Sequence, residues 1–189
     1  VAAYLDYQSR VLKIVLGSSP DSAVISNFAT VSSTSLGPGA GCVNNQCSST
    51  FVYGLASGGV AGAPVFATDA SNNVLHSLSA SGVDALQPFD RTKLAPVNAS
   101  SKSALWGVTA SSKVAGTIFV ADRYGYRVLS VVVATGATKV IAGTGSKGNS
   151  GDGGPATAAT LEPHLITIDA LGRNLFVSDI TAGAIRIID

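Results

Sequence analysis

Four segments of the chain share one pattern of hydrophobic and polar positions. In each, a run of β-branched or aromatic residues ends at an aspartate, a short polar turn follows, and a second apolar run begins. The segments are AAYLDYQSRVLKIV from Ala2, PVFATDASNNVLHSL from Pro64, TIFVADRYGYRVLSVVV from Thr117 and NLFVSDITAGAIRIID from Asn174. Apolar runs on both sides of a turn of Asp, Ser, Asn or Gly are typical of β-hairpins. The sequence therefore predicts hairpins near residues 2–15, 64–78, 117–133 and 174–189.

A further strand is predicted upstream of each of the last three hairpins. These strands are FVYGLAS from Phe51, LWGVTAS from Leu105 and HLITIDA from His164, and TKVIA at residues 138–142 adds a fourth strand after the third hairpin. Units of up to four consecutive antiparallel strands, repeated along a chain, indicate the blades of a β-propeller. We therefore predict an all-β protein in which residues 1–189 form a single propeller domain of about four blades.

The repeat is longer than in common propellers. The equivalent aspartates are Asp6, Asp69, Asp122 and Asp179, which are 63, 53 and 57 residues apart, against about 40 to 50 residues for common propeller repeats. We expect the extra length in loops between blades, notably residues 17–50 and 80–103. With four hairpins but three inner strands, the chain is expected either to close with one defective blade or to form an open, incomplete arc, whose exposed faces and edges need a partner.

Composition favours the same fold class and argues against two kinds of partner. Glu162 is the only glutamate, methionine is absent, and the chain has 21 glycines, a poor supply for long helices. Twelve basic and eleven acidic residues give a net charge of +1, without a dense basic cluster for nucleic acid. No apolar stretch reaches the about 18 residues of a membrane span.

The C-terminal sequence carries a family resemblance. The stretch VIAGTGSKGNSGDGGPATAATLEPHLITIDALGRNLFVSDITAGAIRIID, from Val140, resembles the NHL-repeat β-propellers, in particular the bacterial subgroup with a GDGGPATAA loop between blades. The resemblance implies that residues 151–159 connect two blades, with glycines at positive φ and with Pro155 stiffening the entry to the next blade. Gly54 and Gly107 fit the family's inner-strand glycine, whereas Leu165 replaces it in the last unit.

The repeated aspartates are the most regular polar feature, and we predict a structural role for Asp6, Asp69, Asp122 and Asp179. An aspartate at the end of a strand can accept hydrogen bonds from the next backbone amides and fix the turn. Arg10 and Arg127 follow their aspartates closely enough to reach across the hairpin. A calcium site would require the four carboxylates to converge, whereas equivalent positions of different blades are spread around the propeller axis.

Other motifs do not predict catalysis, a cofactor or a metal. The G-x-G-x-x-G pattern from Gly143 precedes a run that disfavours helices, although a dinucleotide site needs a helix there. Zinc at the central channel of related propeller enzymes is bound by several histidines, and only His76 and His164 occur here. Trp106 and Tyr53 start equivalent inner strands, where packing between blades is the expected role of an aromatic residue.

Two short motifs favour an extracellular location. Cys42 and Cys47 lie in a polar, glycine-rich segment that suits a short-loop disulfide, with two free thiols as the alternative. Asn98 begins an Asn-Ala-Ser triplet, which matches the N-glycosylation acceptor pattern.

The function predicted from these features is a non-catalytic extracellular module for protein–protein interaction. A weakly charged surface does little to repel its own copies, and a head-to-tail contact that does not close forms a fibre, so self-assembly into an oligomer or filament is part of the hypothesis. Two alternatives stay open. One is a propeller lyase or hydrolase with a metal at its channel loops, and the other is a glycan-binding module that uses Tyr124 and Tyr126.

Overall fold

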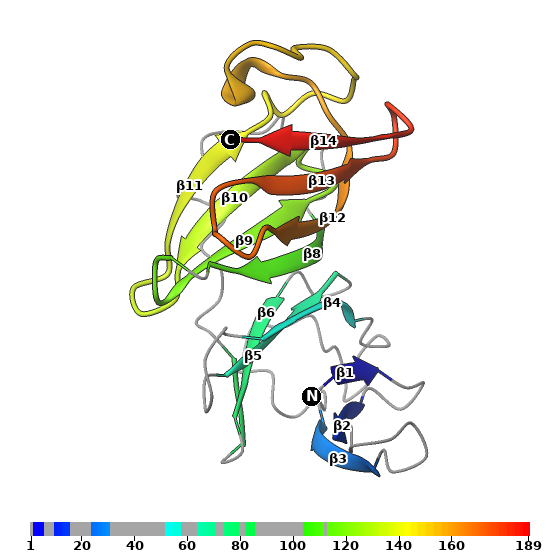
Figure 1. Cartoon of the computed structure of the whole chain (residues 1–189), viewed down its shortest axis with the longest axis vertical. Helices are drawn as coiled ribbons and strands as arrows, with labels where there is room; N and C mark the ends of the chain where they lie inside the picture. Colours follow the sequence, from blue (N-terminus) through cyan, green and yellow to red (C-terminus); the bar gives the residue numbers. More distant parts are fainter. Residues whose placement is uncertain are drawn as a thin grey trace, which may run out of the picture.

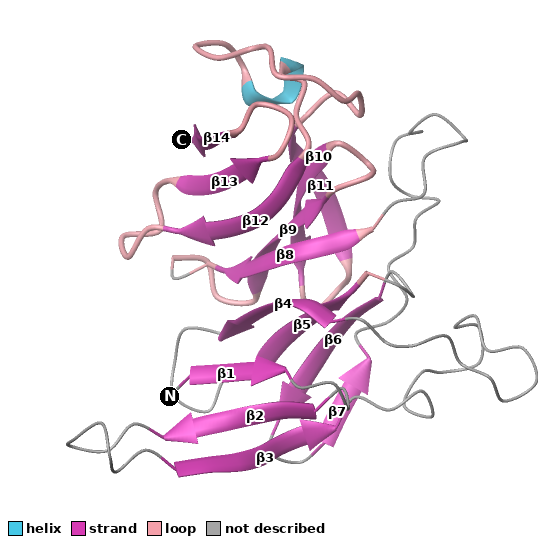
Figure 2. Cartoon of the chain, turned by 90° about the vertical axis from the view of Figure 1, so that its right-hand side faces the viewer, coloured by secondary structure: helices cyan, strands magenta, loops and turns pink. Residues whose placement is uncertain are grey.

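The chain folds into antiparallel β-sheets, each built from consecutive strands. The computed structural model describes residues 2–5, 10–15, 24–30, 52–57, 64–70, 74–79, 82–85, 104–111 and 113–189. Within these ranges there are four sheets, which we call blades 1 to 4 in chain order. They succeed one another along the long axis of the molecule from the N-terminal to the C-terminal part (Figure 1, Figure 2).

The strands of each blade follow chain order. Blade 1 contains β1 (Ala2–Leu5), β2 (Arg10–Val15) and β3 (Val24–Thr30). Blade 2 contains β4 (Val52–Ser57), β5 (Val65–Asp69), β6 (Val74–Ser79) and β7 (Gly82–Ala85). Blade 3 contains β8 (Leu105–Ala110), β9 (Thr117–Asp122), β10 (Arg127–Val132) and β11 (Ala137–Ala142). Blade 4 contains β12 (Pro163–Ile168), β13 (Leu175–Asp179) and β14 (Ala184–Ile188), and the 3-10 turn η4 (Ala156–Ala158) lies in the connection before it.

The predicted all-β class is confirmed. Every strand pairing within a blade is antiparallel, and the strand pairs β1–β2, β5–β6, β9–β10 and β13–β14 occupy the positions of the four expected hairpins. In the described residues, no helix has the length and apolar character required to cross a membrane.

The first strands of blades 2, 3 and 4 pack closely on one another. A Cβ atom added to Gly107 of β8 would lie 2.8 Å from the carbonyl oxygen of His164 and 2.8 Å from the amide nitrogen of Ile166, both in β12. One added to Gly54 of β4 would lie 3.0 Å from the amide nitrogen of Val108 in β8. The absence of a side chain therefore lets each of these two strands approach the backbone of the next blade.

Among the described residues, two apolar clusters fill the space between blades 2 and 3 and the space between blades 3 and 4. Side chains of blades 2 and 3 form one cluster, consisting of Phe66, Leu75, Leu105, Val108, Ile118, Val120 and Val131. Blades 3 and 4 and the connection between them form the other, consisting of Ala121, Val128, Ala142, Ala159, Leu161, Ile166, Leu175 and Val177. Because alternate side chains of a strand point to opposite faces, blade 3 contributes one face to each cluster.

The two segments expected to be inter-blade loops also contain strands, so that part of the prediction is wrong. β3 lies within residues 17–50 and pairs with β2, and β7 lies within residues 80–103 and pairs with β6. Both are the last strands of their blades. Each of them extends a sheet that its blade has already formed, and pairing with the neighbouring strand stabilises sequences whose own alternation of apolar and polar residues is weak.

Candidate functional site

Asp122 ends β9, and its buried carboxylate joins three parts of blade 3. Oδ1 accepts hydrogen bonds from the backbone amides of Gly125, at 3.0 Å, and Ala104, at 3.2 Å, while Oδ2 accepts one from Nε of Arg127 at 3.0 Å. Ala104 immediately precedes β8. The carboxylate thus connects the turn of the hairpin to the start of the first strand of the blade.

Asp179 makes the equivalent contacts in blade 4. Its Oδ1 accepts hydrogen bonds from the amides of Glu162 and Thr181, both at 3.1 Å, and of Ala182 at 3.2 Å. Glu162 immediately precedes β12, as Ala104 precedes β8. The arginine partner lies further along the chain from its aspartate than in blade 3, because Arg186 follows Asp179 by seven residues. Its Nη1 donates a hydrogen bond to Oδ2 of Asp179 at 3.3 Å.

The remaining predicted site residues are described only in part or not at all. Asp69 ends β5, but its side chain is not described, and Asp6, Cys42, Cys47 and Asn98 lie outside the described residues. Of the two arginines expected to cross a hairpin, Arg127 contacts Asp122, while only the backbone of Arg10 is described. Within the described ranges, no three His, Cys, Asp or Glu side chains are grouped so that they could hold a metal ion.

Glu162 links blade 3, the connection after it and blade 4. Nε and Nη2 of Arg123 both lie 3.2 Å from Oε1. Nζ of Lys147, at 2.7 Å, and Oγ1 of Thr181, at 2.8 Å, contact Oε2. The hydrogen bond from Lys147 lowers the pKa of Glu162 in spite of its burial, and the same bond raises the pKa of Lys147. The only glutamate of the chain therefore has a structural position.

Trp106 is flanked by other side chains of the protein. The guanidinium carbon of Arg123 lies 4.5 Å from the centre of the indole ring and 5.2 Å from that of the Tyr124 ring. The His164 ring is centred 4.5 Å from the indole at an interplanar angle of 50°. These contacts give Trp106 the interblade packing role expected from the sequence, with a cation–π contribution from Arg123.

His164 should make the stability of the chain depend on pH. Burial lowers the pKa of His164, and the positive charge of Arg123 lowers it further. The unfolded chain then binds more protons than the folded one, so the stability is fully present above the ordinary histidine pKa of about 6.5 and falls as the pH drops toward the folded-state value. We expect His164→Phe, which retains a ring beside Trp106, to remove this part of the dependence. Urea unfolding midpoints at neutral and mildly acidic pH measure the effect, and an unchanged difference between them would contradict the assignment.

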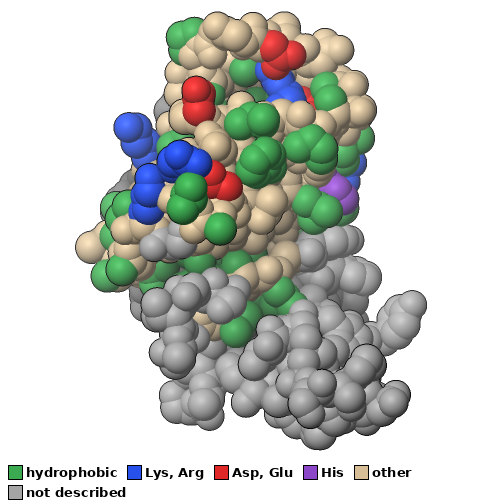
Figure 3. All heavy atoms as spheres, in the orientation of Figure 1, with side chains coloured by type: hydrophobic (Ala, Val, Ile, Leu, Met, Phe, Trp, Pro, Cys, Tyr) green, Lys and Arg blue, Asp and Glu red, His purple; other side chains and the backbone are tan. Residues whose placement is uncertain are grey.

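One face of blade 4 is apolar and uncovered by the described residues. We call it the outer face, and it consists of the side chains of Leu165, Thr167, Phe176, Ser178, Ile185 and Ile187, which strand register and alternation place together. Leu165 is 52% exposed, Ile185 66% and Ile187 62%. Hydrophobic side chains gather over β13 and β14 in the space-filling view (Figure 3). The outer face carries no charged side chain.

The matching face of blade 3 is covered by blade 4. Val128 of β10 and Ile185 of β14 occupy equivalent positions. Each of them pairs with the residue that directly precedes the aspartate at the end of the neighbouring strand. Val128 is fully buried in the cluster between blades 3 and 4. Leu165 stands where blade 3 has Gly107. A strand packed on β12 at the spacing found at Gly107 would collide with the Leu165 side chain.

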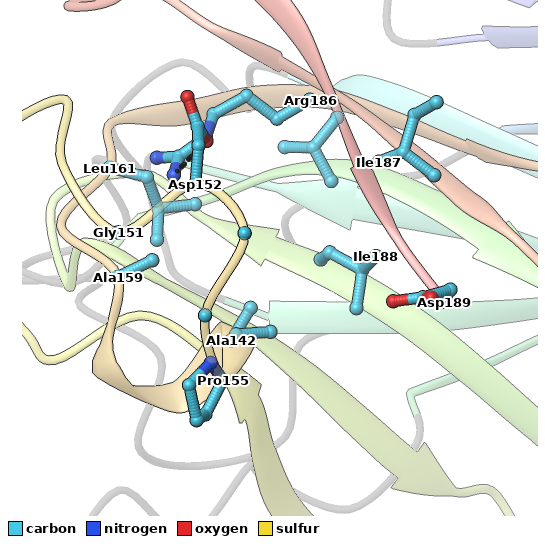
Figure 4. A pocket seen from close by; sticks show the side chains of 14 residues that line it. Ala142, Gly151, Asp152, Pro155, Ala159, Leu161, Arg186, Ile187, Ile188 and Asp189 are labelled. Atoms are coloured by element: carbon cyan, nitrogen blue, oxygen red, sulfur yellow. Dashed lines mark hydrogen bonds and ion pairs between the residues drawn. The ribbon is translucent and has the colours of Figure 1, made fainter.

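A cavity lies beside β14, on the side opposite to the outer face. Its volume is about 260 Å³, and residues 151–156 of the connection form one wall while residues 186–189 form another. Figure 4 shows Ile187 and Ile188 pointing to opposite sides of β14. Arg186 at the rim is engaged by protein acceptors, because its Nη2 donates to Asp152 at 2.6 Å and to the Ser150 carbonyl at 3.1 Å.

The comparison with known structures assigns the architecture. Neither a protein-family model nor a curated protein matches the sequence. A chain of a nidogen/laminin complex superposes with a TM-score of 0.57 and 15% identity over 96% of this chain. A structural genomics protein of unknown function from Bacteroides thetaiotaomicron superposes with a TM-score of 0.67 and 11% identity over 98% of this chain. The fold is a β-propeller.

This chain covers only part of each similar structure. The chain spans 58% of the nidogen/laminin chain and 43% of the Bacteroides protein. At identities of 15% and 11%, the likeness concerns the fold alone. The likeness therefore assigns no functional residue to this chain.

Sequence reasoning did not predict two sets of contacts in this propeller. The Glu162 contacts bring together segments around residues 123, 147 and 181, which share no local motif. The Arg186 contact with Asp179 does not follow the spacing of Arg127 and Asp122. An exposed apolar blade face was expected for an open arc, but the alternation of Ile185 and Ile187 around Arg186 does not by itself reveal which face is uncovered.

Proposed function

We propose that this chain is a non-catalytic extracellular propeller module of the NHL type that acts by protein–protein contact, and that copies of itself are among its partners. The observation that carries the proposal is the outer face. Val128 is buried under the next blade, whereas its counterpart Ile185 is 66% exposed. A contiguous apolar surface without charges is typical of a protein-binding site.

The side chain of Leu165 favours contact with a separate protein surface over contact with another blade at the close spacing found at Gly54 and Gly107. Glycine at the equivalent positions Gly54 and Gly107 permits close approach of the next strand's backbone. A partner at blade 4 must instead stand further from β12 and accommodate a projecting leucine. The apolar area that Leu165 would bury in such a contact favours association.

The remaining parts of the proposal rest on the sequence and on the comparisons. The cysteine pair at residues 42 and 47 and the glycosylation motif at Asn98 favour an extracellular location. The GDGGPATAA connection favours the NHL type, and Gly151 and Gly153 adopt the positive φ expected there, 99° and 78°. The nidogen/laminin structure is a complex, so a similar propeller fold occurs in a protein assembly.

A non-catalytic role accounts best for the buried acids. Asp122, Asp179 and Glu162 all accept hydrogen bonds that fix turns or join blades. A lyase or hydrolase would need carboxylates directed at a substrate or metal. Stoichiometric zinc or calcium in the purified protein would contradict this part of the proposal. The glycan alternative retains Tyr124, which is exposed at 40%, whereas Trp106 is already flanked by Arg123 and His164.

Self-association tests the proposal. In sedimentation velocity over a wide concentration range, the wild-type chain should form dimers or larger assemblies, and electron microscopy should show whether they are filaments. The double variant Ile185→Asn, Ile187→Asn should shift the chain to monomers, because two polar amides would be desolvated in the contact. A wild-type chain that is monomeric throughout would overturn self-association.

The matched control replaces exposed apolar residues that lie in turns. Val114 and Leu171 are 59% and 58% exposed and follow the first strands of blades 3 and 4. The double variant Val114→Asn, Leu171→Asn should associate like the wild type. Equal loss of association in both double variants would show that general surface hydrophobicity, and not the outer face, drives assembly.

A further inference from the structure

The turns between the second and third strands of blades 3 and 4 share one backbone geometry. In each, the aspartate carboxylate accepts a hydrogen bond from the amide three residues later, which belongs to Gly125 in blade 3 and to Ala182 in blade 4. The residue four positions after the aspartate has a positive φ, 52° at Tyr126 and 62° at Gly183. The turn of blade 4 therefore shows that this geometry forms without aromatic side chains.

Blade 3 has three larger side chains in this turn. They are Arg123, Tyr124 and Tyr126, at the positions where blade 4 has Ile180, Thr181 and Gly183. A positive φ favours glycine, and a tyrosine in this conformation has an energetic cost. Backbone conformations of this kind cluster at binding and active sites. The two tyrosines thus point to a role beyond forming the turn.

Arg123 is the centre of a fixed stack that presents Tyr124 to solvent. Its guanidinium carbon lies 4.5 Å from the centre of the Trp106 indole and 5.2 Å from the centre of the Tyr124 ring. Oε1 of Glu162 accepts hydrogen bonds from Nε and Nη2 of Arg123, both at 3.2 Å, which fixes the plane of the guanidinium. Tyr124 is 40% exposed. A tyrosine ring held in this way offers contact area to a ligand with little loss of side-chain entropy.

The polar groups beside the Tyr124 ring are positively charged hydrogen-bond donors. Among the described residues, Arg123 donates from Nε and Nη2 but not from Nη1. Nζ of Lys147 contacts Oε2 of Glu162 at 2.7 Å, and the lysine side chain is 56% exposed. The hydrogen bond with Glu162 raises the pKa of Lys147, and the neighbouring Tyr126 raises it further, so the ammonium is charged at neutral pH. Two positive charges share the one negative charge of Glu162, which leaves a net positive charge and further donors.

We propose that this turn binds a carboxylated sugar of a glycan, with the sugar ring stacked on Tyr124 and its carboxylate at Lys147 and Arg123. We call Arg123, Tyr124, Tyr126 and Lys147 the turn site. The C–H groups of a sugar ring pack on an aromatic face, and a carboxylate accepts charge-assisted hydrogen bonds from guanidinium and ammonium groups. A net charge of +1 over the whole chain disfavours nucleic acid as the ligand. The inference goes beyond the proposed function, because the ligand is a carbohydrate and the turn site includes no residue of the outer face.

Two acidic sugars probe the turn site in nuclear magnetic resonance titrations of the isotope-labelled chain. They are tetragalacturonic acid, which carries uronic acids, and sialyllactose, which carries a sialic acid. At least one should shift the amide signals of residues 123–126 in a saturable manner, and which one does so identifies the sugar. The uncharged counterparts, the galacturonate methyl ester and lactose, should bind about ten-fold more weakly. The proposal fails if neither acid binds, if charged and uncharged sugars bind equally, or if a polyglutamate peptide binds as well as the sugars.

Substitutions with matched controls assign the two parts of the turn site. Tyr124→Ala removes the stacking ring and Lys147→Gln removes a positive charge, and each should weaken sugar binding about ten-fold. Leu171→Ala removes a side chain that is 58% exposed in the turn after β12, and Lys139→Gln removes an exposed lysine of β11. Both controls should change binding by less than about two-fold. Equal losses in variants and controls would overturn the assignment, and if a variant unfolds, the comparison of charged and uncharged sugars in the wild-type chain decides.

Tyr126→Gly distinguishes a binding role of this tyrosine from a structural one. Glycine suits the φ of 52°, so the urea unfolding midpoint should not fall. Sugar binding should weaken about five-fold, because the phenol beside Lys147 is lost. A lower unfolding midpoint together with unchanged binding would show that Tyr126 serves packing, and would remove it from the turn site.

Discussion

A Gly107→Ala substitution should lower the free energy of unfolding by about 1 to 3 kcal/mol. The added Cβ would lie 2.8 Å from the His164 carbonyl oxygen and from the Ile166 amide nitrogen, and 2.9 Å from the Cα atom of Leu165. All three are backbone atoms, so no side-chain rotation can relieve the contact. β8 and β12 must separate, which loosens the apolar cluster between blades 3 and 4. Urea unfolding, with the slope and midpoint compared between variant and wild type, measures the loss.

Gly154→Ala is the matched control for this prediction. Gly154 lies in the connection between the same two blades, but the nearest atom to its added Cβ is the Gly151 carbonyl oxygen at 3.5 Å, an ordinary contact. The expected change in stability is within about 0.5 kcal/mol. Equal destabilisation by the two substitutions would show that flexibility of the glycine, and not close packing of the first strands, accounts for Gly107.

The fold was predictable from the sequence because the hairpins repeat at the level of single residues. Each hairpin combines apolar runs with an aspartate at the end of its first strand, so pattern and turn chemistry indicate the same structure. β3 and β7 were missed for a local reason. β3 contains Ser26 and Asn27 in its middle, and β7 has only four residues, including Gly82 and Asp84. Such strands form because a neighbouring strand offers a pairing edge, which sequence alternation does not report.

The candidate site was predictable only where contacts are local. The role of Asp122 follows from residues within five positions, namely the turn amide of Gly125 and the guanidinium of Arg127. Its contact with Ala104, eighteen residues away, depends on how β8 packs beside β9. The exposure of Ile185 depends on what lies beyond blade 4. Features that arise from packing between blades therefore required the structure.

An Asp122→Ala substitution should lower the free energy of unfolding by about 3 to 5 kcal/mol, the loss expected when one partner of a buried ion pair is removed. The side chain of Asp122 is fully buried, that of Arg127 is 5% exposed, and their atoms lie 3.0 Å apart. Removing the carboxylate leaves the buried guanidinium without this counter-charge and removes the acceptor of the Gly125 and Ala104 amides. Chemical unfolding of the purified variant measures the effect, and Asp122→Asn, which preserves the shape, should cost less.

The Asp152→Ala substitution separates the effect of burial on stability from the effect of losing an ion pair with arginine. Asp152 also pairs with an arginine, at 2.6 Å from Nη2 of Arg186, but its side chain is 81% exposed. Exposed ion pairs contribute about 0 to 1 kcal/mol because water and salt screen the charges, and Arg186 retains Asp179. The two aspartates thus have similar partners and similar distances but differ in solvent access. Comparable losses from both substitutions would mean that Asp122 acts as an ordinary surface charge and that the repeated aspartate does not hold the blade together.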